Sequence, residues 1–146
     1  SHWGHIYFTK ADITFDGVVI STGNFIVDMT SISVDDISGG GKNRLENHLK
    51  DDDFFSVDKF NNAELEILEK SEMIDNKYLV EANLTIKGIT NPITFEMTLM
   101  DSGSYKALLV FDRSKYDVQY RSGSFFENLG DRLILDDVEL EVTLIK

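Results

Sequence analysis

Apolar and polar residues alternate along most of this chain, and a period of two residues is the pattern of half-buried β-strands. The clearest case is a predicted hairpin with strands Tyr78–Ile86 and Ile93–Leu99 and a turn at Gly88–Pro92. Each strand has one apolar and one largely polar face, which is typical of an antiparallel sheet that covers a core on one side. The apolar faces carry Tyr78, Val80, Ala82, Leu84, Ile86, Ile93, Phe95, Met97 and Leu99.

The same alternation predicts further strands. They are expected at Ile6–Phe15, Val18–Val34, Ala63–Ile74, Tyr105–Phe111, Tyr116–Tyr120 and Val138–Leu144. Asp16–Gly17 is a tight-hairpin signal, and Gly23 is expected to mark a bulge or bend. About seven or eight antiparallel strands without repeats or linkers predict an all-β domain, either a barrel or a sandwich. An eight-stranded barrel has room for its own side chains or for one slender ligand.

One segment departs from this alternation and predicts a short helix. Asn43 stands three residues before Glu46, the spacing of an N-cap residue and its reciprocal partner. Leu45, His48 and Leu49 then fall on one helical face. A single helix of this kind, in a chain that otherwise predicts strands, suggests a lid or plug on a barrel. A barrel covered by such a helix can hold a ligand, and the remaining residues indicate which kind of ligand to expect.

Length and composition describe one globular domain. The chain has 146 residues, of which 42% are hydrophobic, enough to bury a core. Ten phenylalanines and five tyrosines suit strands around an apolar interior. No apolar stretch reaches the roughly 20 residues needed to span a bilayer, so a membrane-spanning protein is not expected.

Charge disfavours several classes of partner. The formal net charge is −12, from 14 basic and 26 acidic residues. Nucleic-acid backbones and anionic membrane surfaces would both be repelled. The chain has no cysteine, which excludes disulfides, thiolate catalysis and cysteine-ligated zinc.

His48 is a candidate for chemistry because it lies on the apolar face of the predicted helix. It could act in catalysis or contact a ligand head group, or it could be a half-buried histidine that hydrogen-bonds a neighbouring strand or loop. No serine has a recognisable nucleophile setting, so we expect a protein without enzymatic turnover.

The histidines and carboxylates do not predict a metal site. His2 and His5 are three residues apart, and an odd separation on a strand places them on opposite faces. Asp51–Asp53 lacks the glycine and distal glutamate of a calcium-binding loop, and predicts solvated carboxylates that cap the turn after the helix. No metal or other cofactor is therefore expected.

Arg113 follows Leu109 and Phe111 on an apolar face, where a charge is costly unless it is paired. Its expected partners are Asp112 or Asp117, and a ligand's polar end is the alternative.

Five motifs occur in series along the chain. They are G-N-F-I-V-D-M-T-S-I (Gly23–Ile32), R-L-E-N-H-L-K-D-D-D-F-F (Arg44–Phe55), L-T-I-K-G-I-T-N-P-I (Leu84–Ile93), D-R-S-K-Y-D-V (Asp112–Val118) and S-G-S-F-F-E-N-L-G-D (Ser122–Asp131). Together they resemble the YceI-like family of polyisoprenoid-binding proteins. One such motif would be weak, but five at the family's spacing cover nearly the whole chain.

This resemblance implies a lipocalin-like antiparallel β-barrel with one short α-helix, with residues 1–146 as a single domain. It also implies a long apolar cavity for an isoprenoid chain, and location in the periplasm or outside the cell. Family members usually carry another strand before the segment that resembles His2–Ile6, so about one N-terminal strand, and any signal peptide, is expected to be missing. Closure of the barrel is therefore an open question. Asn61 stands where the family often has proline, which changes a turn.

Pattern and resemblance together predict a non-enzymatic carrier or binder of a long apolar ligand, such as a polyisoprenoid or another lipid. The methionines among the predicted wall residues can adapt to an irregular ligand. The predicted ligand wall consists of Phe25, Val27, Met29, Val80, Leu84, Phe95, Met97, Leu109, Phe111, Tyr116, Leu140 and Val142.

Two alternatives remain open. One is an enzyme or stress-response factor that uses His48 and nearby carboxylates. The other is a surface interaction module that uses Trp3, Tyr7 and exposed aromatic residues. The sequence does not determine the ligand, its head group or the oligomeric state, including whether the protein forms a homodimer.

Overall fold

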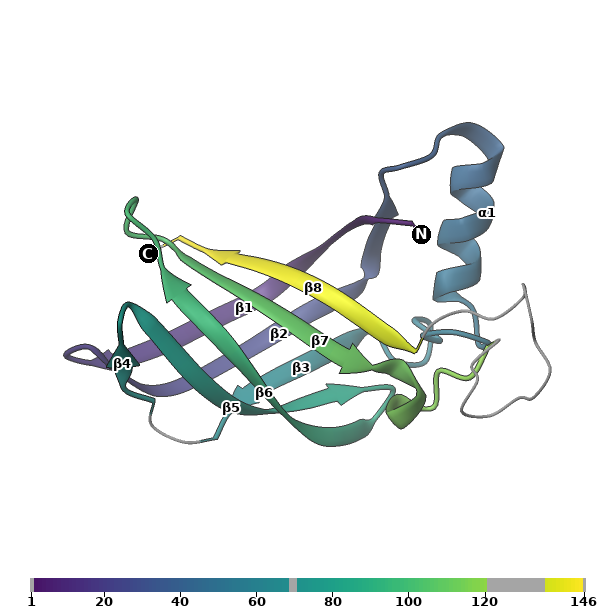
Figure 1. Cartoon of the computed structure of the whole chain (residues 1–146). Coiled ribbons are helices and arrows are strands. Elements are labelled where there is room, and N and C mark those ends of the chain that lie inside the picture. Colours follow the sequence, from purple (N-terminus) through teal and green to yellow (C-terminus); the bar gives the residue numbers. More distant parts are fainter. Residues whose placement is uncertain (1, 69–70, 121–135, 146) are drawn as a thin grey trace.

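The chain folds as a curled antiparallel sheet whose strand order follows the chain. The computed structural model describes residues 2–68, 71–120 and 136–145. The two-residue strand β4 (Met73–Ile74) pairs with β5 beside the main path. The main path runs β1 (Gly4–Asp16), β2 (Val19–Val34), β3 (Asn62–Ile67), β5 (Lys77–Ile86), β6 (Ile89–Leu99), β7 (Tyr105–Asp112) and β8 (Asp137–Leu144). Figure 1 shows the sheet curled into a half-barrel, which confirms the predicted all-β, barrel-like class.

The helical elements gather at one end of the half-barrel. The α-helix α1 (Gly39–Lys50) follows β2, and the 3-10 helix η1 (Arg113–Tyr116) follows β7. In Figure 1 both lie at the end where β8 begins, whereas the β1–β2 hairpin lies at the opposite end. In the parts of the chain that the structure describes, no helix combines the length and apolar character needed to cross a bilayer.

The β5–β6 hairpin is tighter than predicted. Lys87 and Gly88 alone form the turn, with φ of 53° and 73°, and Ile86 already pairs with Ile89. Two consecutive positive φ angles describe the two-residue turn that matches the twist of a hairpin. Pro92 therefore lies inside β6 rather than in the turn. The pairing of β6 with β7 begins only at Glu96, beyond the proline. Pro92 therefore interrupts no backbone pairing between these two strands.

Gly23 forms no bulge, which was one of the two features expected there. It pairs in regular register with Ile13 on β1 and with Ile67 on β3. A Cβ atom at this position would lie 2.5 Å from Cδ1 of Ile67. Close side-chain packing across the sheet, rather than backbone geometry, therefore accounts for the glycine.

Two predicted strands differ from those observed. The strand expected at Ala63–Ile74 is divided into β3 and the short β4, with residues 69–70 outside the described part of the chain. The strand expected at Tyr116–Tyr120 is absent from the described structure, because η1 occupies its first position. Asp112 favours η1, since its carboxylate accepts hydrogen bonds from the Ser114 amide at 2.9 Å and from the Ser114 hydroxyl.

The α-helix begins earlier than predicted. It starts at Gly39 with Ser38 as the N-cap residue, and the Ser38 side chain makes no cap hydrogen bond. Asn43, the predicted cap, lies inside the helix. Glu46 does not return to Asn43 but accepts a hydrogen bond from the amide of Val34 at 3.3 Å. This contact ties α1 to the end of β2.

The buried apolar residues form two clusters along the inside of the sheet. The hairpin-end cluster consists of Ile20, Phe25, Ile67, Tyr78, Val80, Ala82, Phe95, Met97, Tyr105, Ala107 and Leu109. The helix-end cluster consists of Met29, Phe54, Val57, Ala63, Leu84, Ile86, Phe111, Tyr116 and Val118. Leu65, Ile93 and Leu140 are half-buried and pack against both clusters, so the apolar interior is continuous along the half-barrel.

Candidate ligand-binding site

The structure brings all the predicted wall residues into this interior. Phe25, Val80, Phe95, Met97 and Leu109 belong to the hairpin-end cluster, and Met29, Leu84, Phe111 and Tyr116 belong to the helix-end cluster. Val27, Leu140 and Val142 are half-buried and pack against them. For the wall residues on strands, the alternation of the sequence therefore located the inward faces correctly, whereas Tyr116 reaches the interior from η1. Contact of these residues with a ligand remains a prediction.

Three aromatic rings cluster at the hairpin end of the interior. Phe15 stacks on Tyr105 with ring centroids 5.5 Å apart and also lies 6.3 Å from Tyr78. The Tyr78 hydroxyl donates a hydrogen bond to the carbonyl oxygen of Val18 in the β1–β2 turn. Burial raises the pKa of Tyr78, and the neighbouring Tyr105 raises it further. Aromatic side chains of β1, β5 and β7 therefore pack against one another at this end.

A second aromatic group connects α1 to the helix end of the interior. The His48 ring lies 4.3 Å from the Tyr120 ring and 5.2 Å from the Phe54 ring, both edge to face. Phe54 follows α1 and belongs to the helix-end cluster. His48 is half-buried, as one alternative proposed, but its described contacts are with aromatic rings. No pattern in the sequence indicated Tyr120 as its partner.

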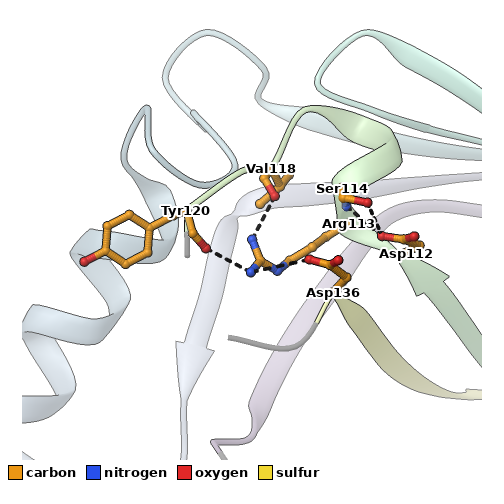
Figure 2. A network of polar contacts seen from close by, with 6 residues as sticks. All are labelled: Asp112, Arg113, Ser114, Val118, Tyr120 and Asp136. Atoms are coloured by element: carbon orange, nitrogen blue, oxygen red, sulfur yellow. Dashed lines mark hydrogen bonds and ion pairs between the residues drawn. The ribbon is translucent and has the colours of Figure 1, made fainter. Parts of the chain in front are cut away.

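Arg113 organises the polar groups at this end (Figure 2). Only 1% of its surface is exposed, and its guanidinium donates to the carbonyl oxygens of Val118 at 2.8 Å and Tyr120 at 2.9 Å. The guanidinium also lies 3.9 Å from the Asp136 carboxylate and 5.2 Å from the centroid of Phe54. Burial lowers the pKa of Arg113, and the Asp136 carboxylate acts in the opposite direction.

The expected ion-pair partners of Arg113 were therefore wrong in part. Asp112 acts on Arg113 through its charge, and its carboxylate caps the start of η1. Asp117 is the C-cap residue of η1, where its backbone amide donates to the Arg113 carbonyl oxygen. Asp136 is the ion-pair partner, and the Arg113 amide also donates to the Asp136 carbonyl at 2.8 Å. This pair links the end of β7 to the start of β8. It depends on tertiary structure, so the local sequence could not reveal it.

Tyr116 places a hydroxyl group inside the helix-end cluster. This oxygen is buried and lacks a hydrogen bond of normal geometry within the described residues. Burial raises the pKa of Tyr116, and Asn91 acts in the opposite sense. The hydroxyl is a polar group on the wall of an otherwise apolar interior.

A shallow polar depression of about 470 Å³ lies outside this interior. Its lining residues are Asn47, Lys50, Asp51, Asp52, Val57 and Asp58. The carboxylates serve the turn after α1, as predicted. Asp51 accepts from the Asp53 amide at 3.1 Å, and Asp52 accepts from the Ser56 hydroxyl at 2.7 Å. The hydrogen bonds from Ser56 and Lys59 lower the pKa of Asp52. Such a surface suits water rather than hydrocarbon.

His2 and His5 bind separate carboxylates near the start of β1. Nδ1 of His2 lies 2.8 Å from Asp36, and Nδ1 of His5 lies 2.7 Å from Asp35. The two pairs hold the start of β1 against the end of β2. In the described ranges, no group of three metal-ligating side chains comes together.

A curled antiparallel half-barrel with a continuous apolar interior and a helix at one end defines a lipocalin-like fold. The YceI-like domain model matches residues 2–145, and the chain belongs to this family.

Relatives in sequence and structure agree with this assignment. A UPF0312 protein of Staphylococcus aureus (strain bovine RF122 / ET3-1) is 28% identical over 154 aligned residues, covering 95% of this chain and 85% of the relative. The crystal structure of Burkholderia cenocepacia BcnA matches with a TM-score of 0.74 and 21% identity, covering 94% of this chain and 82% of BcnA.

A second structural neighbour has a descriptive name. It is a polyisoprenoid-binding domain from Saccharophagus degradans implicated in plant cell wall breakdown. It matches with a TM-score of 0.55 and 13% identity, covering 85% of this chain and 75% of that domain. At these identities both structural matches establish the fold.

Proposed function

We propose that this protein binds a long apolar molecule, such as a polyisoprenoid or another lipid, against the inward face of the half-barrel. The observation that carries the proposal is the continuity of the two apolar clusters, which Leu65, Ile93 and Leu140 join into one interior. The name of the Saccharophagus degradans neighbour supports the same class of ligand. Burial of hydrocarbon contributes about 0.8 kcal/mol per methylene, enough to offset the cost of association for a long chain.

The two ends of the interior suggest an orientation for the ligand. Phe15, Tyr78 and Tyr105 line the hairpin end with packed aromatic rings. The helix end carries His48 and the Tyr116 hydroxyl. In our proposal the hydrocarbon tail points to the hairpin end, and the polar head group lies near α1.

A binding role without turnover fits the surroundings of His48. An enzyme would need this side chain beside a nucleophile or a carboxylate that orients it. The described contacts of His48 are instead the rings of Phe54 and Tyr120. We further propose location in the periplasm, as implied by family membership, and transport of the bound lipid as the physiological role.

Enlarging a small inward residue tests the proposal. Ala107 is buried on β7 opposite Met97, whereas its neighbour Leu108 is 57% exposed on the outer face. We expect Ala107→Phe to reduce uptake of a fluorescent prenyl lipid at least about tenfold, because the ring fills space that hydrocarbon would occupy. Leu108→Phe is the matched control and should bind like the parent protein.

The denaturant midpoint of each variant is measured alongside uptake. Overpacking of a filled core costs about 1–3 kcal/mol, whereas a ring placed in ligand space costs less. The proposal is wrong if the parent protein takes up no prenyl lipid and Ala107→Phe is severely destabilised. That result would mean that the interior is filled by its own side chains.

Exposed aromatic residues at and just before the start of β1 favour a second candidate, a surface interaction module. Trp3 and Tyr7 are 66% and 62% exposed, and the His5 ring lies 4.9 Å from Tyr7. Loss of a surface-dependent activity in Trp3→Ala, with prenyl lipid uptake unchanged, would favour this candidate.

A further inference from the structure

Two tyrosines inside the half-barrel are almost completely buried, and their hydroxyl groups differ in their hydrogen bonding. Tyr78 and Tyr116 are each 1% exposed. The Tyr78 hydroxyl donates a hydrogen bond to the carbonyl oxygen of Val18. The Tyr116 hydroxyl, by contrast, has no hydrogen bond of ordinary geometry to any of the described residues. Tyr116 therefore carries a buried polar group that the fold itself does not satisfy.

The partner that Tyr116 lacks is an acceptor for its proton. Burial raises the pKa of Tyr116, so the hydroxyl keeps its proton at neutral pH. Asn91 acts in the opposite direction, which is the effect of a group that donates toward the phenol oxygen. The Asn91 amide also donates to the carbonyl oxygen of Lys115 at 3.0 Å. Within the described residues, these contacts leave the O–H donor of Tyr116 without an acceptor.

The 3-10 helix η1, which carries Tyr116, is fixed at both ends. At its start, the Asp112 carboxylate accepts a hydrogen bond from the Ser114 amide at 2.9 Å. At its end, the Lys87 ammonium group of the β5–β6 turn donates to the carbonyl oxygen of Asp117 at 2.9 Å. A side chain on such a bonded turn keeps its orientation, so the hydroxyl is a preorganised donor.

Tyr116 lies on the wall of the apolar interior. Its ring packs edge to face against Phe111, an inward residue of β7, with ring centroids 5.8 Å apart. Asn91 pairs with the buried Leu84 and shares the inward face of β6 with Ile93. Ile93 is one of the residues that join the two apolar clusters. A long molecule along this interior would therefore reach Tyr116 at the helix end.

The hydroxyl of Tyr116 destabilises the free protein. A buried donor without an acceptor carries an uncompensated loss of hydration, whereas phenylalanine would fill nearly the same space without that loss. A ligand oxygen that accepts the hydrogen bond would remove the penalty in the complex. The hydroxyl then contributes to discrimination between ligands, because a ligand without an acceptor leaves it unpaired.

Charge at the helix end favours an uncharged acceptor. Arg113 is the only buried charged side chain in the described part of the chain. It already donates to the carbonyl oxygens of Val118 and Tyr120 (Figure 2). It also lies 3.9 Å from the Asp136 carboxylate. A phosphate group at this end would have to compete for a cation that is already paired, and burial of an unpaired charge is costly.

We propose that the Tyr116 hydroxyl determines ligand specificity by donating a hydrogen bond to an uncharged oxygen at one end of a long apolar molecule. The inference rests on the proposed lipid binding and adds the chemistry of the ligand's polar end. Prenyl lipids with an alcohol, ether or carbonyl oxygen are then preferred to hydrocarbons of the same length and to prenyl phosphates.

The test compares three probes that share one prenyl chain. They are geranylgeraniol, the hydrocarbon in which a methyl group replaces its alcohol group, and geranylgeranyl phosphate. Affinities are measured by competition with a fluorescent prenyl lipid. We expect the parent protein to prefer the alcohol to the hydrocarbon by about tenfold, the contribution of one buried hydrogen bond. The phosphate should bind more weakly than the alcohol.

A variant that lacks only the hydroxyl isolates its effect. Tyr116→Phe should bind the alcohol and the hydrocarbon nearly equally, because neither then leaves a protein donor unpaired. Tyr7→Phe is the matched control at an exposed position and should keep the preference of the parent protein.

Denaturant midpoints in the absence of lipid distinguish a ligand contact from a structural hydrogen bond. Tyr78→Phe should lower the midpoint, because it removes a hydrogen bond that the folded protein makes. Tyr116→Phe should leave the midpoint unchanged or raise it, because it removes a donor that the free protein leaves unpaired.

Four results would overturn the proposal. They are equal affinity of the parent protein for the alcohol and the hydrocarbon, an unchanged preference in Tyr116→Phe, tighter binding of the phosphate than of the alcohol, and a midpoint loss in Tyr116→Phe as large as that in Tyr78→Phe. The last result would show that the folded protein or a bound water already satisfies the hydroxyl. Binding of none of the probes would contradict the proposed lipid binding as well, whereas equal binding of alcohol and hydrocarbon would remove only the role of Tyr116.

Discussion

Single residues at the helix end show how a buried charge is accommodated in this fold. Arg113 lies among apolar neighbours. Two of its guanidinium nitrogens donate hydrogen bonds to the backbone carbonyl oxygens of Val118 and Tyr120. The sequence indicated that the charge needs a partner, because Leu109 and Phe111 precede it on an apolar face. It could not indicate Asp136, since this contact depends on the return of β8 beside β7.

We expect Arg113→Ala to lower the free energy of unfolding by about 3–5 kcal/mol, because it leaves buried acceptors and a carboxylate without their partner. Arg113→Lys should recover little of this loss, since one ammonium group cannot reach two carbonyls in the same geometry. Denaturant titration measures both variants. Arg44→Ala, at an exposed position on α1, is the control and should change stability by less than about 0.5 kcal/mol. A fully stable Arg113→Lys variant would contradict the bridging role.

Two buried tyrosines predict a loss of stability in alkali. Burial raises the pKa of Tyr78 and Tyr116 above the ordinary value of 10.0. The folded state therefore holds these phenol protons to higher pH than the unfolded state does. Above about pH 10 the unfolded chain ionises first, so the free energy of unfolding falls as pH rises toward the folded pKa values.

The measurement is the denaturant midpoint as a function of pH between about 8 and 12. Tyr116→Phe should show a smaller alkaline loss than the parent protein. Tyr7→Phe, at an exposed position, should follow the parent curve. Identical curves for the parent and Tyr116→Phe would show that this hydroxyl titrates alike in both states.

At the scale of elements, the N-terminus of α1 lacks a side-chain cap, whereas backbone hydrogen bonds stabilise its C-terminus. Three glycines open the helix and no side chain caps it. At the other end, the amides of Phe55 and Val57 donate to the carbonyls of Leu49 and Lys50 at 3.1 Å and 2.9 Å. The sequence predicted the end correctly but placed the start at Asn43, because N-cap spacing carried more weight than a glycine run.

Two neighbouring glycines of α1 should respond oppositely to alanine. Gly39 has φ of 67°, whereas Gly40 is not in the left-handed region and has only Arg44 within 4 Å of an added Cβ. We expect Gly40→Ala to raise the free energy of unfolding by up to about 1 kcal/mol, through helix propensity and reduced freedom of the unfolded chain. Gly39→Ala should lower it by about 1 kcal/mol or more. Denaturant midpoints and amide exchange in α1 measure both effects, and equal responses would contradict the assigned start of the helix.

At the scale of the whole molecule, the sequence predicted the inward faces better than the connections. A period of two residues places every second side chain on one face, so the wall residues on strands could be predicted locally, with Tyr116 of η1 as the exception. The predicted boundaries of the elements depended on patterns of only a few residues. The Lys87–Gly88 turn and η1 were misplaced because Gly88–Pro92 suggested a longer turn and Tyr116–Tyr120 continued an alternation.

The path of the chain through the sheet has a consequence for how the protein folds. Strand order follows chain order, so most pairings join segments that are close in sequence. The β5–β6 hairpin, with a two-residue turn and ten paired positions, can form early because closing its loop costs little entropy. The pairing of β2 with β3 must instead close residues 35–61, which contain α1. The pairing of β7 with β8 must likewise close residues 113–136. These two pairings are therefore the steps most exposed to loop-closure entropy, and the rate of folding should depend on them.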